Sequence, residues 1–214
     1  MPGERPDPIW LYRLVHKDNL EQVLQRGIHA FQHTDFIAPK VRMGDIVLAE
    51  KRDNHELKMP ATGTIGDHVA FYFSGHSPML LKIMTGTGVV QHHQRDIVYI
   101  LVRLQAVIDA GRPYVVTDGH AKDALTDCYT GPEGLDRIDW DAVRAQFWKD
   151  TEEYRDRKRR KQAEFLVRGH LPAEAIGALA VYDEDRRREV SDLVTRSGRD
   201  IRVKVDTSRK LYYP

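Results

Sequence analysis

Short apolar runs alternate with polar and turn-forming stretches along the whole chain. Runs of roughly four to eight residues that are rich in β-branched and aromatic side chains are typical of buried strands. The pattern therefore predicts a protein built on short strands, at residues 9–15, 69–73, 97–104, 113–117, 163–168, 176–183 and 201–206.

Capping and stop signals predict helices between these strands. Asp18 or Asn19 is suited to cap a short helix that Gly27 ends, and Pro78 favours the first turn of another helix. The stretch 30–60 is polar and mostly irregular, which is typical of a functional or disordered segment. Further helices are predicted at 44–52, 78–84, 139–148 and 184–195. Asp139 is the expected cap of the third of these, which leads into a charged helix that extends to Lys161.

The order of these elements predicts the fold class. Strands and helices follow one another without a regular β-α-β alternation, so we expect an α+β fold. We find no internal repeat and no long linker, and 214 residues suit one domain, residues 1–214. A chain of this size buries roughly 70% of its unfolded surface, so it needs no disulfide or metal to hold a core.

Composition narrows the class of protein. The formal net charge is only +1, so overall charge indicates no acidic partner. No apolar run approaches the roughly 20 residues of a membrane span, and the N-terminus lacks the pattern of a signal peptide. A single cysteine, Cys128, cannot form an internal disulfide and is expected to be an inert thiol. We therefore expect a cytoplasmic protein without a membrane partner.

Local charge is less even than total charge. Residues 155–161 have the sequence RDRKRRK. Such a run is either a phosphate-binding patch or the solvated face of a helix, and charge alone does not decide between them. No metal site is predicted, because the ten histidines, including the pair His92 and His93, show no zinc-ligand spacing. The chain also contains no P-loop, dinucleotide fingerprint or nucleophile elbow.

Glu164 is the outstanding candidate for chemistry. It lies in QAEFLV, directly after the basic run and at the start of an apolar strand. A carboxylate so close to a core is costly unless it is paired or has a function. The residues alone leave two interpretations open, a local ion pair with Arg159 or Arg168 and a catalytic carboxylate.

Four stretches follow one another along the chain: LYRLVHKDNLEQVLQRGI, GDHVAFYFSGHSPML, TDGHA and RKQAEFLV. In this order, and on to the terminal KLYY, they resemble the DarT family of DNA ADP-ribosyltransferase toxins. The resemblance implies a fold like that of bacterial ADP-ribosylating toxins, with a central β-sandwich cleft of short strands that holds NAD⁺ as cosubstrate and flanking helices. It also implies modification of a base in single-stranded DNA, by a toxin or phage-defence effector, and an antitoxin partner that is often a macrodomain ADP-ribosyl hydrolase.

The same resemblance implies roles for individual residues. Glu164 matches the catalytic glutamate, which would hydrogen-bond a ribose hydroxyl, stabilise developing positive charge and help to deprotonate the attacking base. Arg52 matches an arginine of the NAD⁺ site, which would contact the cosubstrate phosphate or the glutamate and help in proton transfer, with Lys51 as the alternative. His120 matches a position near the DNA. Other NAD⁺-site residues are Tyr12, Arg13, Val15, Asn19, Gly27, Tyr72, Ser77 and Met79, and phosphate contacts would come from Arg157, Lys158, Arg159 and Arg160.

Some positions depart from the family pattern. Arg13 stands where a histidine is typical, and the pairs Gly66-Asp67 and Gly75-His76 replace His-Asp and Pro-Arg. These departures leave the modified base open between thymine and guanine. Other hypotheses are the same chemistry on RNA, ADP-ribosylation of a protein, and a catalytically inactive nucleic-acid-binding module.

Overall fold

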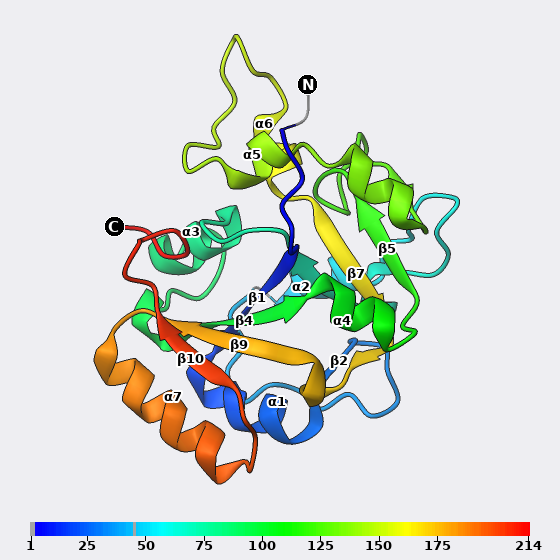
Figure 1. Cartoon of the computed structure of the whole chain (residues 1–214). Helices are drawn as coiled ribbons and strands as arrows, with labels where there is room; N and C mark the ends of the chain where they lie inside the picture. Colours follow the sequence, from blue (N-terminus) through cyan, green and yellow to red (C-terminus); the bar gives the residue numbers. More distant parts are fainter. Residues whose placement is uncertain (1–2, 45) are drawn as a thin grey trace.

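The framework of the protein is a large mixed sheet (Figure 1). A computed structural model describes residues 3–44 and 46–214. Eight strands are ordered β10-β9-β4-β1-β3-β7-β5-β6, of which β9 and β10 are parallel and the other neighbours antiparallel. Their bounds are β1 Trp10–His16, β3 His68–Tyr72, β4 Ile97–Arg103, β5 Tyr114–Thr117, β6 Cys128–Tyr129, β7 Glu164–Arg168, β9 Ile176–Val181 and β10 Arg202–Val205.

A second, two-stranded sheet and seven α-helices complete the described elements. Strands β2 (Ile28–His29) and β8 (His170–Leu171) pair antiparallel. The helices are α1 Leu20–Arg26, α2 Ile46–Asp53, α3 Pro78–Thr85, α4 Leu104–Asp109, α5 Trp140–Arg144, α6 Arg157–Lys161 and α7 Glu184–Arg196, with single 3₁₀ segments at Lys17–Asn19, Ile65–Asp67, Gln94–Asp96, Pro132–Arg137 and Ala173–Ala175. None of these described helices has the length and apolar character needed to cross a bilayer.

The large sheet nearly divides between β1 and β3. Strand β1 pairs with β4 along its whole length, from Trp10 opposite Arg103 to His16 opposite Ile97. Its only register pair with β3 is Tyr12 opposite Tyr72. Two groups of well-paired strands are thus joined at one point, which leaves room for a cleft between them.

One row of residues crosses the sheet at this junction. Tyr12 lies opposite Tyr72, Tyr72 lies opposite Glu164, and Glu164 lies opposite Thr117. Directly opposed residues on neighbouring strands lie close together. The pairing therefore brings Glu164 to the place where the sheet divides.

The hydrophobic core explains why the strands form where they do. Leu11, Phe71 and Phe165 are almost completely buried and belong to one large cluster between the sheet and its helices. On the other side, Tyr99 and Tyr212 form a second cluster with α3. The C-terminal residues fold back there, and a smaller third cluster contains Ile65 and Leu166. The predicted apolar runs are therefore the walls of adjoining cores.

Most predicted elements are confirmed, and the α+β class with them. The single helix predicted over 139–148 is wrong. Asp139 caps α5 as expected, accepting the N–H of Ala142 at 3.0 Å, but α5 ends at Arg144. Residues 145–156 form a protruding loop at the top of Figure 1 before α6 begins. Trp148 donates to the Tyr213 hydroxyl at 2.9 Å, and Phe147 is exposed, so this segment has no continuous apolar face to pack as a helix.

Candidate active site

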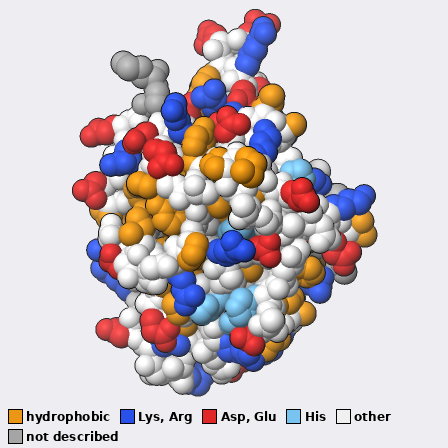
Figure 2. Space-filling model, turned by 90° about the vertical axis from the view of Figure 1, so that its right-hand side faces the viewer, with side chains coloured by type: hydrophobic (Ala, Val, Ile, Leu, Met, Phe, Trp, Pro, Cys, Tyr) orange, Lys and Arg blue, Asp and Glu red, His pale blue; other side chains and the backbone are white. Residues whose placement is uncertain are grey.

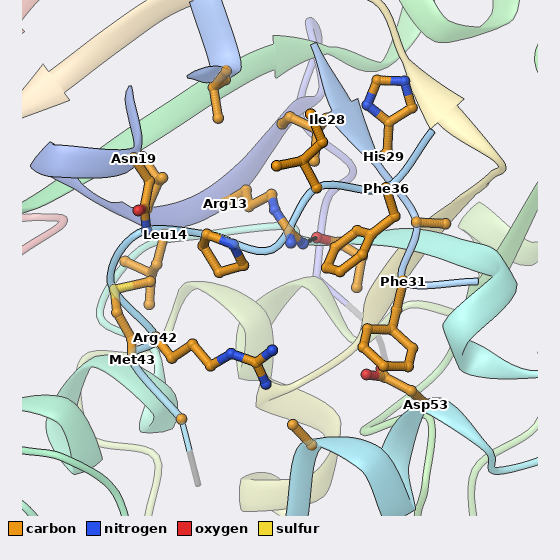
Figure 3. A pocket seen from close by; sticks show the side chains of 18 of the residues that line it. Arg13, Leu14, Asn19, Ile28, His29, Phe31, Phe36, Arg42, Met43 and Asp53 are labelled. Atoms are coloured by element: carbon orange, nitrogen blue, oxygen red, sulfur yellow. Dashed lines mark hydrogen bonds between the residues drawn. The ribbon is translucent and has the colours of Figure 1, made fainter. Parts of the chain in front are cut away.

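A cavity of about 350 Å³ lies beside the division of the sheet. Strands β1 and β3, α2 and the irregular segment 30–44 surround it (Figure 3). Arg42 and Met43 lie on one side of the cavity in this view, with Phe31 and Asp53 on the other. Among the predicted NAD⁺-site residues, those that line it are Arg13, Val15, Asn19, Gly27, Arg52 and Met79.

Three residues predicted for the NAD⁺ site do not line this cavity. Ser77 is buried and caps α3, accepting the N–H of Leu80 at 3.2 Å. Tyr12 packs edge-on against Tyr99, with ring centroids 6.4 Å apart. Tyr72 lies next to Glu164, where burial raises the pKa of its hydroxyl to about 12, so the hydroxyl stays protonated at neutral pH.

Two residues shape the cavity through the backbone. Gly27 has φ +76°, and a Cβ there would lie 2.3 Å from the Leu171 carbonyl oxygen, so only glycine fits where the chain turns from α1 into β2. Asn19 was predicted as a possible helix cap, but its side chain caps nothing. It donates to the carbonyl of Val41 at 2.7 Å and accepts the Val41 N–H at 2.9 Å. Asn19 thereby holds segment 30–44 over the cavity.

Arg13 spans the division of the sheet. Its Nη1 donates to the carbonyl of Ala70 on β3 at 2.7 Å. Burial lowers the pKa of this guanidinium, and the nearby Arg52 lowers it further. Arginine nevertheless remains charged at neutral pH. Two half-buried cations therefore line the cavity, an arrangement suited to an anionic ligand.

Glu164 is 1% exposed and is held on both carboxylate oxygens. Its Oε2 forms an ion pair with Nη2 of Arg52, and its Oε1 accepts the N–H of Ala121 at 3.0 Å. Its own N–H donates to the Thr117 hydroxyl at 3.0 Å. Glu164 does not itself line the cavity; Arg52 does, and links the two.

This pair decides two questions that the sequence left open. The partner of Glu164 is Arg52 on α2, which excludes the local ion pair with Arg159 or Arg168 for this conformation. Lys51 is exposed, whereas Arg52 is mostly buried at the cavity. Burial by itself lowers the pKa of Arg52, but Glu164 and other neighbours outweigh it and leave the pKa raised. Arg52 is thus a permanent cation at the carboxylate.

The TDGHA segment closes over Glu164. It supplies the Ala121 N–H, and the backbone N–H of His120 donates to the carbonyl of Arg159 at 3.2 Å. Burial lowers the pKa of His120, against an opposing effect of Glu164. A neutral imidazole therefore lies beside the carboxylate at neutral pH, and the basic run is tied to the same segment.

The basic run has two different faces. Arg159 is buried, with Nη1 3.0 Å from Asp118 and Nη2 2.8 Å from Asp156. Lys158 and Arg160 are exposed, although Arg160 also contacts Asp156. Arg157 lies over the ring of Tyr154, 4.4 Å from its centroid. Arg159 is therefore engaged inside the protein, and phosphate contact stays a prediction for its exposed neighbours.

Sequence reasoning missed several residues around the cavity. Phe31, Phe36, Arg42 and Asp53 all line it. All four belong to the polar stretch 30–60, in which no periodicity marks a side chain that faces a cavity; only the length of that stretch indicated a function. Cys128 is buried, which raises the pKa of its thiol and agrees with the expected inert role.

The chain is similar in sequence to a known protein family. Residues 12–213 match the family described as ssDNA thymidine ADP-ribosyltransferase, DarT. The chain belongs to this family. A DNA ADP-ribosyl transferase from Thermus sp. (strain 2.9) is 32% identical over 208 residues, covering 97% of this chain and 98% of the relative.

Two solved DarT structures share the fold closely. Thermus sp. 2.9 DarT in complex with ADP-ribosylated ssDNA superposes with a TM-score of 0.89 at 30% identity, covering 99% of this chain and all of that one. The same DarT in complex with NAD⁺ gives a TM-score of 0.84 at 30% identity, covering 98% of this chain and 100% of that one. The resemblance seen in the four sequence stretches is therefore confirmed over the whole fold.

Proposed function

We propose that this protein transfers one ADP-ribosyl group from NAD⁺ to a thymine base in single-stranded DNA. The observation that carries the proposal is the Arg52–Glu164 pair beside the 350 Å³ cavity, in a DarT-family fold. Related DarT structures contain NAD⁺ or ADP-ribosylated ssDNA, which supports the same ligands here. The cavity also falls in the size range of small-molecule sites, roughly 300–1,000 Å³.

NAD⁺ supplies the ADP-ribosyl group, and loss of nicotinamide leaves positive charge on the ribose. The carboxylate of Glu164 is suited to stabilise this charge, because a fixed anion in a dry site is a large catalytic contribution. The bond between ribose and nicotinamide breaks, a bond between ribose and a base nitrogen forms, and Glu164 receives the proton of that nitrogen. The reaction is thus a pentosyl transfer.

The two arginines have separate tasks in this proposal. The planar guanidinium of Arg52 matches a phosphate in bidentate fashion. Since Arg52 occupies one oxygen of Glu164, it turns toward the phosphate when the dinucleotide binds and frees that oxygen for the ribose. Arg13, held on the Ala70 carbonyl, stays at the cavity floor as a second positive charge.

The DNA strand meets the other side of Glu164. His120 is half-buried next to the carboxylate and offers a neutral ring for stacking on an unpaired base. Lys158 and Arg160 contribute positive charge nearby for the phosphates. A single strand is the suited target, because a base inside a duplex must be unstacked before it is reached.

A toxin or phage-defence role fits an enzyme that modifies DNA in its own cell. Such an activity needs control, and the family resemblance supports a macrodomain ADP-ribosyl hydrolase as antitoxin. Expression of the chain should arrest growth, and co-expression of that hydrolase should restore it. Growth arrest that persists with Glu164→Gln would overturn the toxin role.

The deciding experiment mixes purified protein, NAD⁺ and short oligonucleotides. We expect thymine-containing DNA to gain the mass of one ADP-ribose, with release of nicotinamide, and Glu164→Gln to form this adduct far more slowly. Modification of guanine alone would contradict thymine as the modified base. Modification of RNA or protein while DNA stays untouched would contradict DNA as the target. Binding without any adduct would identify an inactive binding module.

A further inference from the structure

Three histidines and an aspartate gather at the edge of the cavity, apart from the Arg52–Glu164 pair. His29 ends β2 and His170 begins β8; the two are register partners, and their rings stack with centroids 5.0 Å apart. His33 follows in the turn after β2, with its ring centroid 4.9 Å from that of His29 and 5.9 Å from that of His170. Asp35 lies 3.9 Å from Nδ1 of His33.

The distances suit a metal ion. The ligand atoms of His29, His33 and Asp35 all lie within 4.8 Å of one another. A tetrahedral zinc ion with bonds of about 2.0–2.1 Å holds its ligand atoms about 3.3 Å apart. Side-chain rotations that move each atom by about an ångström close this gap. His33 and Asp35 are free to make them, since 26% and 64% of their side chains are exposed.

The side-chain types of the cluster suit a metal ion. Imidazole nitrogens are common metal ligands in their neutral form. The carboxylate of Asp35 would offset part of the cation's charge.

The start of the segment that carries the cluster is held by two backbone hydrogen bonds. The N–H of Ala30 donates to the Gly169 carbonyl at 2.7 Å, and the N–H of Gln32 donates to the Gly66 carbonyl at 2.9 Å. The backbone N–H of Asp35 also donates to Nδ1 of His33 at 3.1 Å, which leaves Nε2 of that ring for the ion. An ion therefore has only the rest of the turn to order, which limits the entropic cost of binding.

We propose that His29, His33 and Asp35 bind a divalent transition-metal ion of the zinc type, with His170 packed behind His29. Imidazole nitrogens and one carboxylate are donors that zinc prefers, whereas magnesium and calcium take oxygen ligands. Figure 2 shows histidine side chains (pale blue) next to one another at the surface, in the lower part of the view, where they are open to solvent. The remaining coordination position is left to water.

The proposed ion has a structural consequence for the cavity. Phe31 and Phe36 belong to the same turn as His33, and both line the cavity. Their rings pack edge-on, with centroids 5.2 Å apart. An ion that joins His29 on β2 to His33 and Asp35 ties this turn down. It thereby stiffens one wall of the cavity, whichever molecule the cavity binds.

Calorimetric titration of tag-free protein with Zn²⁺ tests the site directly. We expect one ion per chain, with His33→Ala and Asp35→Asn each weakening the affinity by roughly 10–100-fold or more. The control is His93→Asn, because His93 lies outside the cluster. His93 accepts the N–H of Arg95, and an asparagine side chain can accept the same N–H. This variant should bind zinc as the wild type does. An unchanged affinity in both cluster variants, or an equal loss in His93→Asn, would overturn the proposal.

Hydrogen exchange supplies a second measurement that needs no enzymatic activity. Zn²⁺ should slow amide exchange at residues 30–37 in the wild type and leave exchange in His33→Ala unchanged, while Mg²⁺ slows neither. Equal protection by zinc in wild type and variant would show that the ion binds elsewhere. Because His33 is a surface turn residue, its alanine variant is expected to fold, and its unperturbed exchange elsewhere checks this.

Discussion

Arg52 and Glu164 are 112 positions apart in the sequence and form an ion pair whose carboxylate is almost fully buried. The pair connects α2 to β7 and places a permanent cation between the carboxylate and the cavity. A buried carboxylate that loses its partner is strongly disfavoured. The pair is therefore both a structural link and the proposed chemical centre, and the two roles can be separated by substitution.

Glu164→Gln removes the charge and keeps the shape. We expect ADP-ribosyl transfer to fall by about 10²–10⁴-fold, while the protein stays folded, because the amide still accepts the Ala121 N–H. Rates are measured by single-turnover transfer to an oligonucleotide. A folded variant with wild-type rates would remove Glu164 from the mechanism.

Arg52→Ala leaves Glu164 buried without its counter-ion. The free energy of unfolding should fall by about 1–3 kcal/mol, because the carboxylate stays buried without a partner. Denaturant unfolding measures this change. Lys51→Ala, at the exposed neighbour, is the matched control and should leave stability unchanged.

Lys161 predicts a pH dependence of stability. Burial lowers the pKa of its ammonium group to about 7, and Nζ donates to the Ser74 hydroxyl at 3.0 Å. Between pH 7 and the ordinary lysine pKa near 10.4, the unfolded chain binds a proton that the folded chain lacks. The free energy of unfolding of the wild type, relative to that of Lys161→Met, should thus rise with pH in this window, by at most about 1.4 kcal/mol per pH unit. Below pH 7 both states are protonated and the difference should be flat.

This dependence is measured by urea unfolding of wild type and Lys161→Met at several pH values. Subtracting the two curves removes titrations that they share. A difference that stays constant from pH 7 to 10 would show that Lys161 keeps an ordinary pKa in the folded protein.

Substitutions at exposed and at buried residues of the basic run 155–161 should have different effects. Lys158→Ala should weaken oligonucleotide binding and reduce its salt dependence by about one unit of slope, since it removes one phosphate contact. Arg159→Ala should chiefly lower stability, because it breaks buried ion pairs with Asp118 and Asp156. Binding is followed by fluorescence anisotropy at several salt concentrations and unfolding by denaturant. The reverse assignment of effects would contradict the proposed DNA-facing role of the exposed side.

Local patterns in the sequence were enough to place most of the elements. The apolar runs around Leu11, Phe71 and Phe165 predicted their strands, since burial of one face is encoded by neighbouring residues. The helix that ends at Gly27 was also predictable, because positive φ is a local requirement. The loop after α5 was not predictable, since its path depends on a distant partner, Tyr213, at the end of the chain.

What the sequence by itself determined is the set of elements, the position of Glu164 at the start of a strand, and a family resemblance. Only the tertiary structure decided that Arg52, and not Arg159 or Arg168, pairs with Glu164, that Arg159 is buried, and that His29, His33 and His170 meet. These contacts join segments far apart in the chain, and they depend on strand order and register. Hydrophobic periodicity reports what each residue faces locally, but it carries no information about which distant side chain lies opposite.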